Sequence, residues 1–302
     1  MLGPLLFLVY VNDLMVGTQC EWKAFADDYK LCTFEDRAGG HQDSLGSLQR
    51  DLDILTRKSE SWNLVLNHGK CKVMRFGKGR SLGEALYSVN GNILEVVNSY
   101  RDLGVIVDAS LKFHLHVREV VYKAGGLLSN LLRTTVCRSM DFMVALYVSH
   151  VRPIMEYCSC VWGTGYLGDL RLLESLQRRW TREVEGLSLM EYSERLKRMG
   201  LFSVRGRMLR MDMVKVWKAF HCEIDVGLAS IWEVLGLGRT RGHSLRLRMP
   251  VCRSESRRRW FSVRVLKQWN ALPACVVESS TLVGFKRELD AYLGDKLFEA
   301  SA

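Results

Sequence analysis

Apolar residues recur every three or four positions along much of the chain, a spacing that places them on one face of an α-helix. Leu45, Leu48, Leu52 and Leu55 form the first such stripe. Longer stripes predict helices over residues 113–132, 139–151, 167–182, 203–221 and 282–293. The second half of the chain is therefore predicted to be mostly helical.

The first third of the chain has a different pattern. Residues 21–34 contain two runs of apolar and aromatic residues that meet at Asp27 and Asp28, which predicts a β-hairpin with both aspartates at its tip. Residues 87–94 predict a second hairpin, because Asn90-Gly91 suits a tight turn. A buried strand is expected over residues 103–107. Strands followed by helices indicate the α+β class.

The two adjacent aspartates are the first candidate chemistry. Neighbouring carboxylates repel each other unless a cation compensates them, and Mg²⁺ is commonly held by one or two carboxylates together with substrate phosphates. Asp27 and Asp28 are therefore candidate Mg²⁺ ligands for phosphoryl or nucleotidyl transfer. The alternative is that they only form the turn, a common role of aspartate.

Charge adds a candidate partner. Lys and Arg together number 43 against 33 Asp and Glu, and the net charge of +10 favours nucleic acid over a membrane, although a merely soluble basic protein is also compatible with it. Nine cysteines without a regular framework favour free thiols in a reducing compartment, so we expect an intracellular protein of the cytoplasm or nucleus. No apolar run is long enough to span a bilayer, and we expect no membrane association.

Arginines gather in two places. Arg178 and Arg179 come near the end of the helix predicted over residues 167–182. The segment 239–259 contains eight arginines and one acidic residue, and it supplies the candidate phosphate-binding residues Arg239, Arg241, Arg246, Arg248, Arg257, Arg258 and Arg259. The alternative for this segment is an exposed connector whose charge only aids solubility.

Several motifs together resemble one protein family. Gly3-Pro4-Leu5-Leu6-Phe7, Tyr10-Val11-Asn12-Asp13-Leu14 and Phe25-Ala26-Asp27-Asp28 are similar to the palm motifs of reverse transcriptases of non-LTR retrotransposons, the jockey-like group in particular. Later segments continue the resemblance in the same order: residues 62–70, 100–108, 146–162 and 260–273. Tyr29 departs from the family, which more often has threonine after the aspartates.

The resemblance implies a fold and a set of domains. It implies a partial polymerase palm over residues 1–112, a helical thumb over 113–185, and a helical C-terminal region over 186–302 that contains the arginine-rich segment 239–259.

It also implies an activity, RNA-directed DNA synthesis, with an RNA template, a DNA primer or target, deoxynucleoside triphosphates and Mg²⁺. Asp27 and Asp28 would bind the metal, and Lys70 would assist the departure of pyrophosphate. An ordinary surface charge is the alternative for Lys70.

The chain starts inside the motif that precedes the aspartates, so the fingers and the first catalytic aspartate of the family are expected to be missing. We therefore expect a fragment that is inactive alone, with a missing N-terminal half of the same polyprotein as a possible partner. The alternatives are a non-catalytic helical remnant that binds RNA or DNA, and a helical protein that binds a protein partner.

Overall fold

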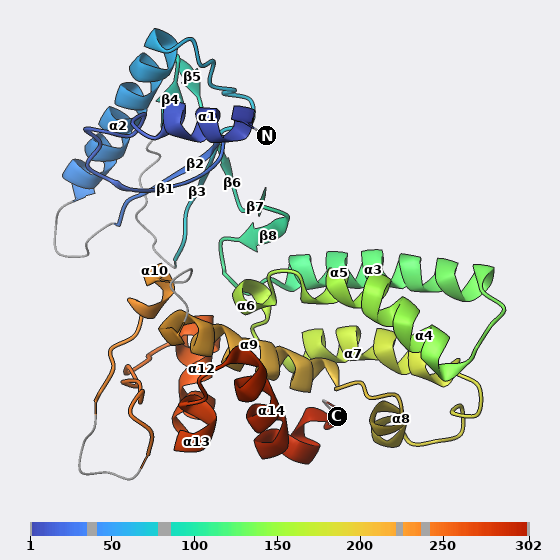
Figure 1. The fold of residues 1–302 in the computed structure, drawn as a ribbon. Helices are drawn as coiled ribbons and strands as arrows, with labels where there is room; N and C mark the ends of the chain where they lie inside the picture. The colour runs from blue at the N-terminus through green and yellow to red at the C-terminus, as the bar shows by residue number, and fades with distance from the viewer. Residues whose placement is uncertain (1, 35–40, 78–85, 222–225, 237–241, 301–302) are drawn as a thin grey trace. The chain divides into compact units, whose positions relative to one another are not determined.

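The computed structural model describes residues 2–34, 41–77, 86–221, 226–236 and 242–300. The chain divides into two compact units, residues 1–100 and 101–302. Figure 1 shows the strands in the first part of the chain and the helices that dominate the second. The presence of separate strands and helices confirms the predicted α+β class.

The first unit is built from short strands and two helices. In chain order its elements are α1 (Leu2–Val11), β1 (Glu21–Phe25), β2 (Asp28–Cys32), α2 (His41–Ser61), β3 (Lys72–Met74), β4 (Ser88–Val89), β5 (Asn92–Ile93) and β6 (Glu95–Val97). β1 and β2 pair antiparallel, as do β4 and β5, whereas β3 pairs parallel to β6. Both predicted hairpins of this unit are thereby confirmed.

Two small hydrophobic clusters stabilise this unit. Leu14, Met15 and Leu55 form one, and Tyr87, Val89 and Leu94 form the other. The leucine stripe of α2 contributes to both clusters, which explains why its apolar residues recur at helical spacing. The Asn90-Gly91 turn has positive φ at both residues, as a tight hairpin turn requires.

The boundary between the units falls inside β7 (Ser99–Asp102), which pairs with β8 (Val105–Asp108). A single strand over residues 103–107 was predicted here. Its bounds are wrong, because the observed strand β8 begins at Val105. Leu103 and Gly104 have φ values of 43° and 85° and form the turn between the two strands. A turn in the left-handed region interrupts the extended conformation that an apolar run predicts.

The second unit is helical after β8. In chain order its elements are α3 (His114–Thr134), α4 (Met140–Leu146), the π-helix η1 (Tyr147–Val151), α5 (Arg152–Glu156), α6 (Ser159–Trp162), α7 (Leu167–Arg182), α8 (Tyr192–Arg198), α9 (Val204–His221), α10 (Val226–Ala229), α11 (Glu255–Arg259), α12 (Phe261–Asn270), α13 (Ala274–Val277), α14 (Leu282–Leu293) and the 3-10 helix η3 (Gly294–Leu297). The helices predicted over 167–182 and 282–293 match α7 and α14.

Two hydrophobic cores hold these helices. The first extends from Val105 to Val204 and packs α3, α5 and α7 around Trp162 and Trp180. The second extends from Met213 to Leu297 and packs α12 and α14 against the C-terminal half of α9. α9 thus contributes to both cores and joins them into one unit. Among the described residues, no helix combines the length and apolarity that a membrane span requires.

Candidate metal site and nucleic-acid interface

The β1–β2 hairpin presents the two aspartates at its tip. Phe25 pairs with Asp28, so the turn consists of Ala26 and Asp27, and Asp28 is the first residue of β2. Ala26 takes a φ of 53°, the positive value that a two-residue hairpin turn needs. Both aspartates are exposed. The prediction that the acids lie at the strand reversal is confirmed, whereas their role as metal ligands stays a prediction.

The body of the hairpin is fixed by packing on one side. Tyr29 and Leu31 pack against the cluster of Leu14, Met15 and Leu55. The Tyr29 hydroxyl donates a hydrogen bond of 3.2 Å to the carbonyl oxygen of Val11, and burial raises the pKa of this phenol. Successive strand residues alternate between faces, so Asp28 lies on the face opposite Tyr29. The tyrosine at this position therefore packs inward beneath the hairpin.

A buried carboxylate that sequence reasoning missed holds the start of β1. Asp51 on α2 is 1% exposed and accepts hydrogen bonds from the backbone amides of Gln19, at 2.9 Å, and Cys20, at 2.6 Å. Leu48, Asp51 and Leu55 fall on one face of α2 by their spacing. The sequence signal that could have revealed Asp51 is an acidic residue on the apolar face of a helix. A carboxylate buried there must accept hydrogen bonds from nearby groups.

The donor set at the hairpin tip fits Mg²⁺. Proteins commonly supply one or two carboxylates to this ion, and substrate phosphates complete its coordination. The hairpin tip offers two adjacent exposed carboxylates. Within the described ranges, no cluster of three or more His, Cys, Asp or Glu side chains is arranged to hold a metal. Asp27 and Asp28 remain the predicted ligands of this ion.

Lys70 lies in the turn between α2 and β3 and is exposed. Its backbone is fixed, since its amide donates to the carbonyl oxygen of Asn67 at 3.0 Å and its carbonyl accepts the Tyr100 hydroxyl at 3.3 Å. Among the hydrogen bonds and ion pairs of the described residues, none links Lys70 to Asp27 or Asp28. The role of Lys70 beside the leaving group stays a prediction.

The two arginines of α7 have different environments. The Arg178 guanidinium lies over the ring of Tyr192, with its Cζ 4.4 Å from the ring centroid. Arg179 is exposed and donates a hydrogen bond of 3.2 Å to the Ser129 hydroxyl. Arg179 is thus the more accessible of the two to a phosphate.

The described part of the arginine-rich segment is packed rather than a bare connector. Leu247 is fully buried, and its backbone amide and carbonyl both bond to the side chain of Asn270. A β-bridge joins Leu247 to Val234, and α11 is capped by the Ser254 hydroxyl. Arg239 and Arg241 lie outside the described residues.

The remaining arginines of this segment differ in how they are held. Arg246 is half-buried. Arg248 forms an exposed ion pair of 2.9 Å with Glu233. Arg257 and Arg258 are exposed on α11, and the Arg257 guanidinium lies 4.6 Å from the ring centroid of Trp260. The three exposed side chains, Arg248, Arg257 and Arg258, leave much of their charge in contact with solvent.

Arg259 is the exception. Its guanidinium lies 4.3 Å from the ring centroid of Tyr166, donates to the carbonyl oxygen of Gly165 at 3.0 Å and pairs with Glu255 at 2.9 Å. Only 29% of its side chain is exposed. These contacts fix Arg259 as a structural link between α11 and the loop before α7.

Comparisons with known proteins bear on the family that the motifs resemble. The chain is 24% identical over 196 residues to the RNA-directed DNA polymerase from mobile element jockey of Drosophila funebris, and the match covers 61% of this chain and 21% of that protein. It is 24% identical over 202 residues to the protein of the same name from Drosophila melanogaster, again covering 61% of this chain and 21% of the relative. The matched region thus spans about a fifth of either relative's length. The resemblance stated from the motifs is confirmed.

Two other comparisons give nothing. No family model matches the chain, and no solved structure matches it.

Proposed function

We propose, from the premise that this chain is similar to the jockey RNA-directed DNA polymerases, that it forms part of the reverse transcriptase of a non-LTR retrotransposon. The observation that carries the proposal is the pair of exposed carboxylates, Asp27 and Asp28, at the tip of an anchored β-hairpin. In this proposal residues 1–112 contribute to the polymerase palm, the helices over residues 113–185 act as the thumb, and residues 186–302 form the helical C-terminal region. The protein would work inside the cell, in the cytoplasm or nucleus.

The proposal gives each candidate residue a role. Asp27 and Asp28 would hold Mg²⁺, which supplies activation of the attacking oxygen and stabilisation of the leaving one. Lys70 would contribute positive charge near the departing pyrophosphate. The exposed arginines Arg179, Arg257 and Arg258 would contact backbone phosphates of the RNA template and DNA primer.

The hairpin alone does not make a complete polymerase in this proposal. Two-metal nucleotidyl transfer uses carboxylates that converge from separate segments, and the proposal assigns only Asp27 and Asp28 to this chain. We therefore expect the chain to bind an RNA–DNA duplex without extending it unless the remaining polymerase segments are supplied.

A non-catalytic RNA- or DNA-binding remnant is the second candidate function. It is favoured by the net charge of +10 together with exposed arginines in the helical unit. It differs from the first proposal in assigning no metal to the hairpin.

A thermal melt in the presence and absence of MgCl₂, at constant ionic strength, separates the two candidates. We expect Mg²⁺ to raise the melting temperature of the wild-type chain in the presence of a deoxynucleoside triphosphate, because a ligand that binds only the folded state stabilises it. Asp27→Asn combined with Asp28→Asn should abolish this shift, while the matched pair Asp53→Asn and Glu60→Asn on α2, which are also exposed, should keep it. An equal shift in both double variants would leave only the second candidate.

Primer extension on a poly(rA) template with an oligo(dT) primer provides the activity test. Any extension by the chain should require Mg²⁺ and should disappear in Asp27→Asn. Extension that persists in this variant would contradict the assigned role of the hairpin.

A further inference from the structure

A small cavity lies in the second unit, outside every site described above. Its volume is about 80 Å³, several times what one water molecule needs. It is lined by residues from η1, α5, α7 and the first turns of α9, with the loop 200–202 as a further wall. Arg152, Glu156 and Arg207 are its charged lining residues.

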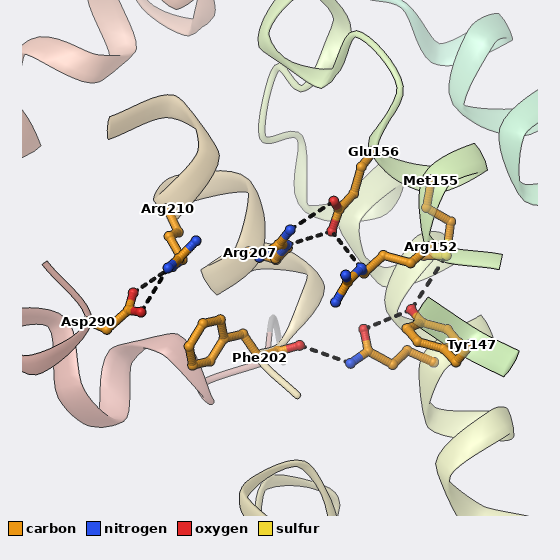
Figure 2. Close-up of polar contacts among 9 residues, drawn as sticks. Tyr147, Arg152, Met155, Glu156, Phe202, Arg207, Arg210 and Asp290 are labelled. Carbon is orange, nitrogen blue, oxygen red and sulfur yellow. Dashed lines mark hydrogen bonds and ion pairs between the residues drawn. The ribbon is translucent and has the colours of Figure 1, made fainter. Parts of the chain in front are cut away.

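The charges in this lining do not balance. Arg207 directs its guanidinium at Glu156 through bonds of 2.7 and 3.2 Å. Arg152 approaches the same carboxylate only to 3.8 Å, which exceeds hydrogen-bonding distance. Figure 2 shows Glu156 between the two guanidinium groups. Two arginines therefore share one carboxylate, and one positive charge is left over.

Arg152 is also short of hydrogen-bond acceptors. In the part of the chain that the structure describes, its guanidinium donates no hydrogen bond, although 29% of its side chain is exposed. Burial lowers the pKa of Arg152 from its usual value, and the positive charge of Arg207 lowers it further. Because arginine nevertheless stays protonated in proteins, the site holds a partly desolvated cation with unused donors.

The neighbouring polar groups are already satisfied. The Tyr147 hydroxyl donates to the side-chain oxygen of Gln177 at 3.2 Å, and the Gln177 amide donates to the carbonyl oxygen of Phe202 at 2.9 Å. Figure 2 draws these bonds as dashed lines at Tyr147 and Phe202. Arg152 is thus the cavity residue whose donors are open to a ligand.

Local backbone geometry places Arg152 there. It directly follows the π-helix η1, and Tyr147, the first residue of that segment, also lines the cavity. One inserted residue rotates the side chains after it by about 100° around the helix axis. Short π segments inside helices are frequent at functional sites, and this one directs two cavity residues.

From this geometry we propose that the cavity binds a phosphate group, with the Arg152 guanidinium as its principal donor and Arg207 as the second. A carboxylate offers two oxygens, and both oxygens of Glu156 already accept from the Arg207 fork. Phosphate offers three or more, enough for two forks that converge from α5 and α9. The source of the phosphate is either the free ion or the terminal phosphate of a nucleic acid.

Isothermal titration of the full chain with sodium phosphate, at constant ionic strength, tests the proposal. Arg152→Gln should weaken phosphate binding by about tenfold or more, the effect of losing charge-assisted hydrogen bonds. Arg118→Gln, which removes an exposed arginine on α3 outside the cavity, should leave the affinity within about twofold. If Arg152→Gln does not fold, Arg152→Lys takes its place. This variant keeps the charge without the planar fork, and its affinity for phosphate should lie between that of the wild-type chain and that expected for Arg152→Gln.

Glu156→Gln supplies a readout that a purely structural ion pair would not give. It removes the carboxylate that competes with the ligand, so phosphate should bind at least as tightly even though the variant is less stable. Weaker binding in this variant, in a sample that circular dichroism shows to be folded, would overturn the proposal.

Three further outcomes would also overturn it. These are no binding of phosphate by the wild-type chain, equal weakening by Arg152→Gln and Arg118→Gln, and binding of acetate as tight as that of phosphate. Inorganic phosphate carries no base or sugar, so failure here is independent of the proposed polymerase role.

A final pair of titrations identifies the source. A trinucleotide with a 5′-phosphate that binds more tightly than both the 5′-hydroxyl form and inorganic phosphate supports a nucleic-acid end. Equal affinity for the 5′-phosphorylated trinucleotide and inorganic phosphate supports the free ion. Either result, if lost in Arg152→Gln, upholds the site.

Discussion

At the scale of single residues, Asp51 shows how a buried acidic side chain can fix the start of a hairpin. Its carboxylate is nearly inaccessible to solvent and bonds to two consecutive backbone amides just before β1. Two consecutive backbone amides that donate to one carboxylate fix the path of the chain at this point. The position of the hairpin in the first unit thus depends on a residue of α2.

We expect Asp51→Ala to lower the free energy of unfolding by about 2 kcal/mol or more, because it leaves the amides of Gln19 and Cys20 without their acceptor. Urea denaturation followed by circular dichroism measures this change. Asp53→Ala on the exposed face of α2 is the matched control and should cost well under half as much. Similar losses in the two variants would contradict the anchoring role.

His116 gives the second unit a dependence on pH. It is 4% exposed, its Nδ1 accepts the Ile106 amide at 3.2 Å, and its Nε2 has no partner among the described residues. Burial lowers the pKa of this imidazole; Glu119 opposes that shift, and Arg101 and Lys123 add to it. Protonation would both charge a buried ring and remove its acceptor.

The sign of the resulting effect follows from proton linkage. Below the unfolded pKa of about 6.5 the unfolded chain binds a proton that the folded chain does not, so stability should fall as the pH drops from 6.5 towards the lower folded pKa. His116→Gln should reduce the loss of unfolding free energy between pH 7 and pH 5, measured by urea titration at each pH. Some loss should remain, because burial also lowers the pKa of His243.

His150→Gln is the control for this experiment, since His150 is exposed. It should leave the pH dependence as in the wild-type chain. An unchanged dependence in His116→Gln would show that this imidazole is not responsible.

At the scale of secondary-structure elements, the start of α9 is joined to the C-terminal part of the chain by a close approach. A Cβ atom on Gly206 would lie 2.3 Å from the carbonyl oxygen of Leu297, so this position requires glycine. Ser203 is fully buried, and its hydroxyl accepts the Gly206 amide at 3.0 Å and donates to the carbonyl oxygen of Glu299 at 2.8 Å.

Gly206→Ala should therefore destabilise the second unit by about 1–3 kcal/mol, the range for overpacking against a fixed backbone. The change is opposite to the usual effect of this substitution within a helix. Gly126→Ala in the interior of α3 is the matched control, because nothing lies within 4 Å of its added methyl group, and it should stabilise by up to about 1 kcal/mol. Thermal melts of both variants decide the point, and stabilisation by both would refute the close packing.

These elements also show what local sequence can predict. The stripes of α7 and α14 gave the correct bounds, because one apolar face of each helix is buried against a core. Ser188 and Glu191 have the spacing of a capping box, but α8 begins at Tyr192 with Glu191 as its N-cap, so they do not form one. Capping depends on backbone dihedrals that the spacing of a serine and a glutamate does not determine.

The helix expected over 139–151 is divided into α4 and the π-helix η1, and α5 continues it. Periodicity did not reveal the inserted residue, because apolar side chains continue on both sides of it. The candidate phosphate cavity was missed for the same reason. Its charged residues come from α5 and α9, and only the tertiary structure brings Arg152 and Arg207 to one carboxylate.

At the scale of the whole molecule, sequence reasoning located the exposed sites better than the buried ones. The adjacent aspartates at a strand reversal and the arginine-rich segment were both recognisable locally. The sequence did not reveal that Arg257 is exposed whereas Arg259 is packed. The ring that Arg259 covers belongs to Tyr166, 93 residues earlier in the chain. Local charge predicted the segment, and tertiary contacts decided which of its arginines stay accessible.

Under the proposed function, the excess of positive charge should determine how the affinity for RNA responds to salt. Neutralising phosphates releases counterions, so the logarithm of the affinity for a single-stranded RNA should fall linearly with the logarithm of the salt concentration. Arg257→Ala with Arg258→Ala should make this slope shallower by about 0.7 for each phosphate that the variant no longer neutralises, as measured by fluorescence anisotropy.

Arg287→Ala with Lys296→Ala removes the same charge from exposed positions on α14 and η3, so it controls for net charge alone and should change the slope less. Arg259→Ala should instead lower the melting temperature, since its guanidinium links α11 to Gly165 and Tyr166. A slope that is unchanged in the Arg257 and Arg258 variant, or changed equally in the control, would show that the arginine-rich segment does not contact the nucleic-acid backbone.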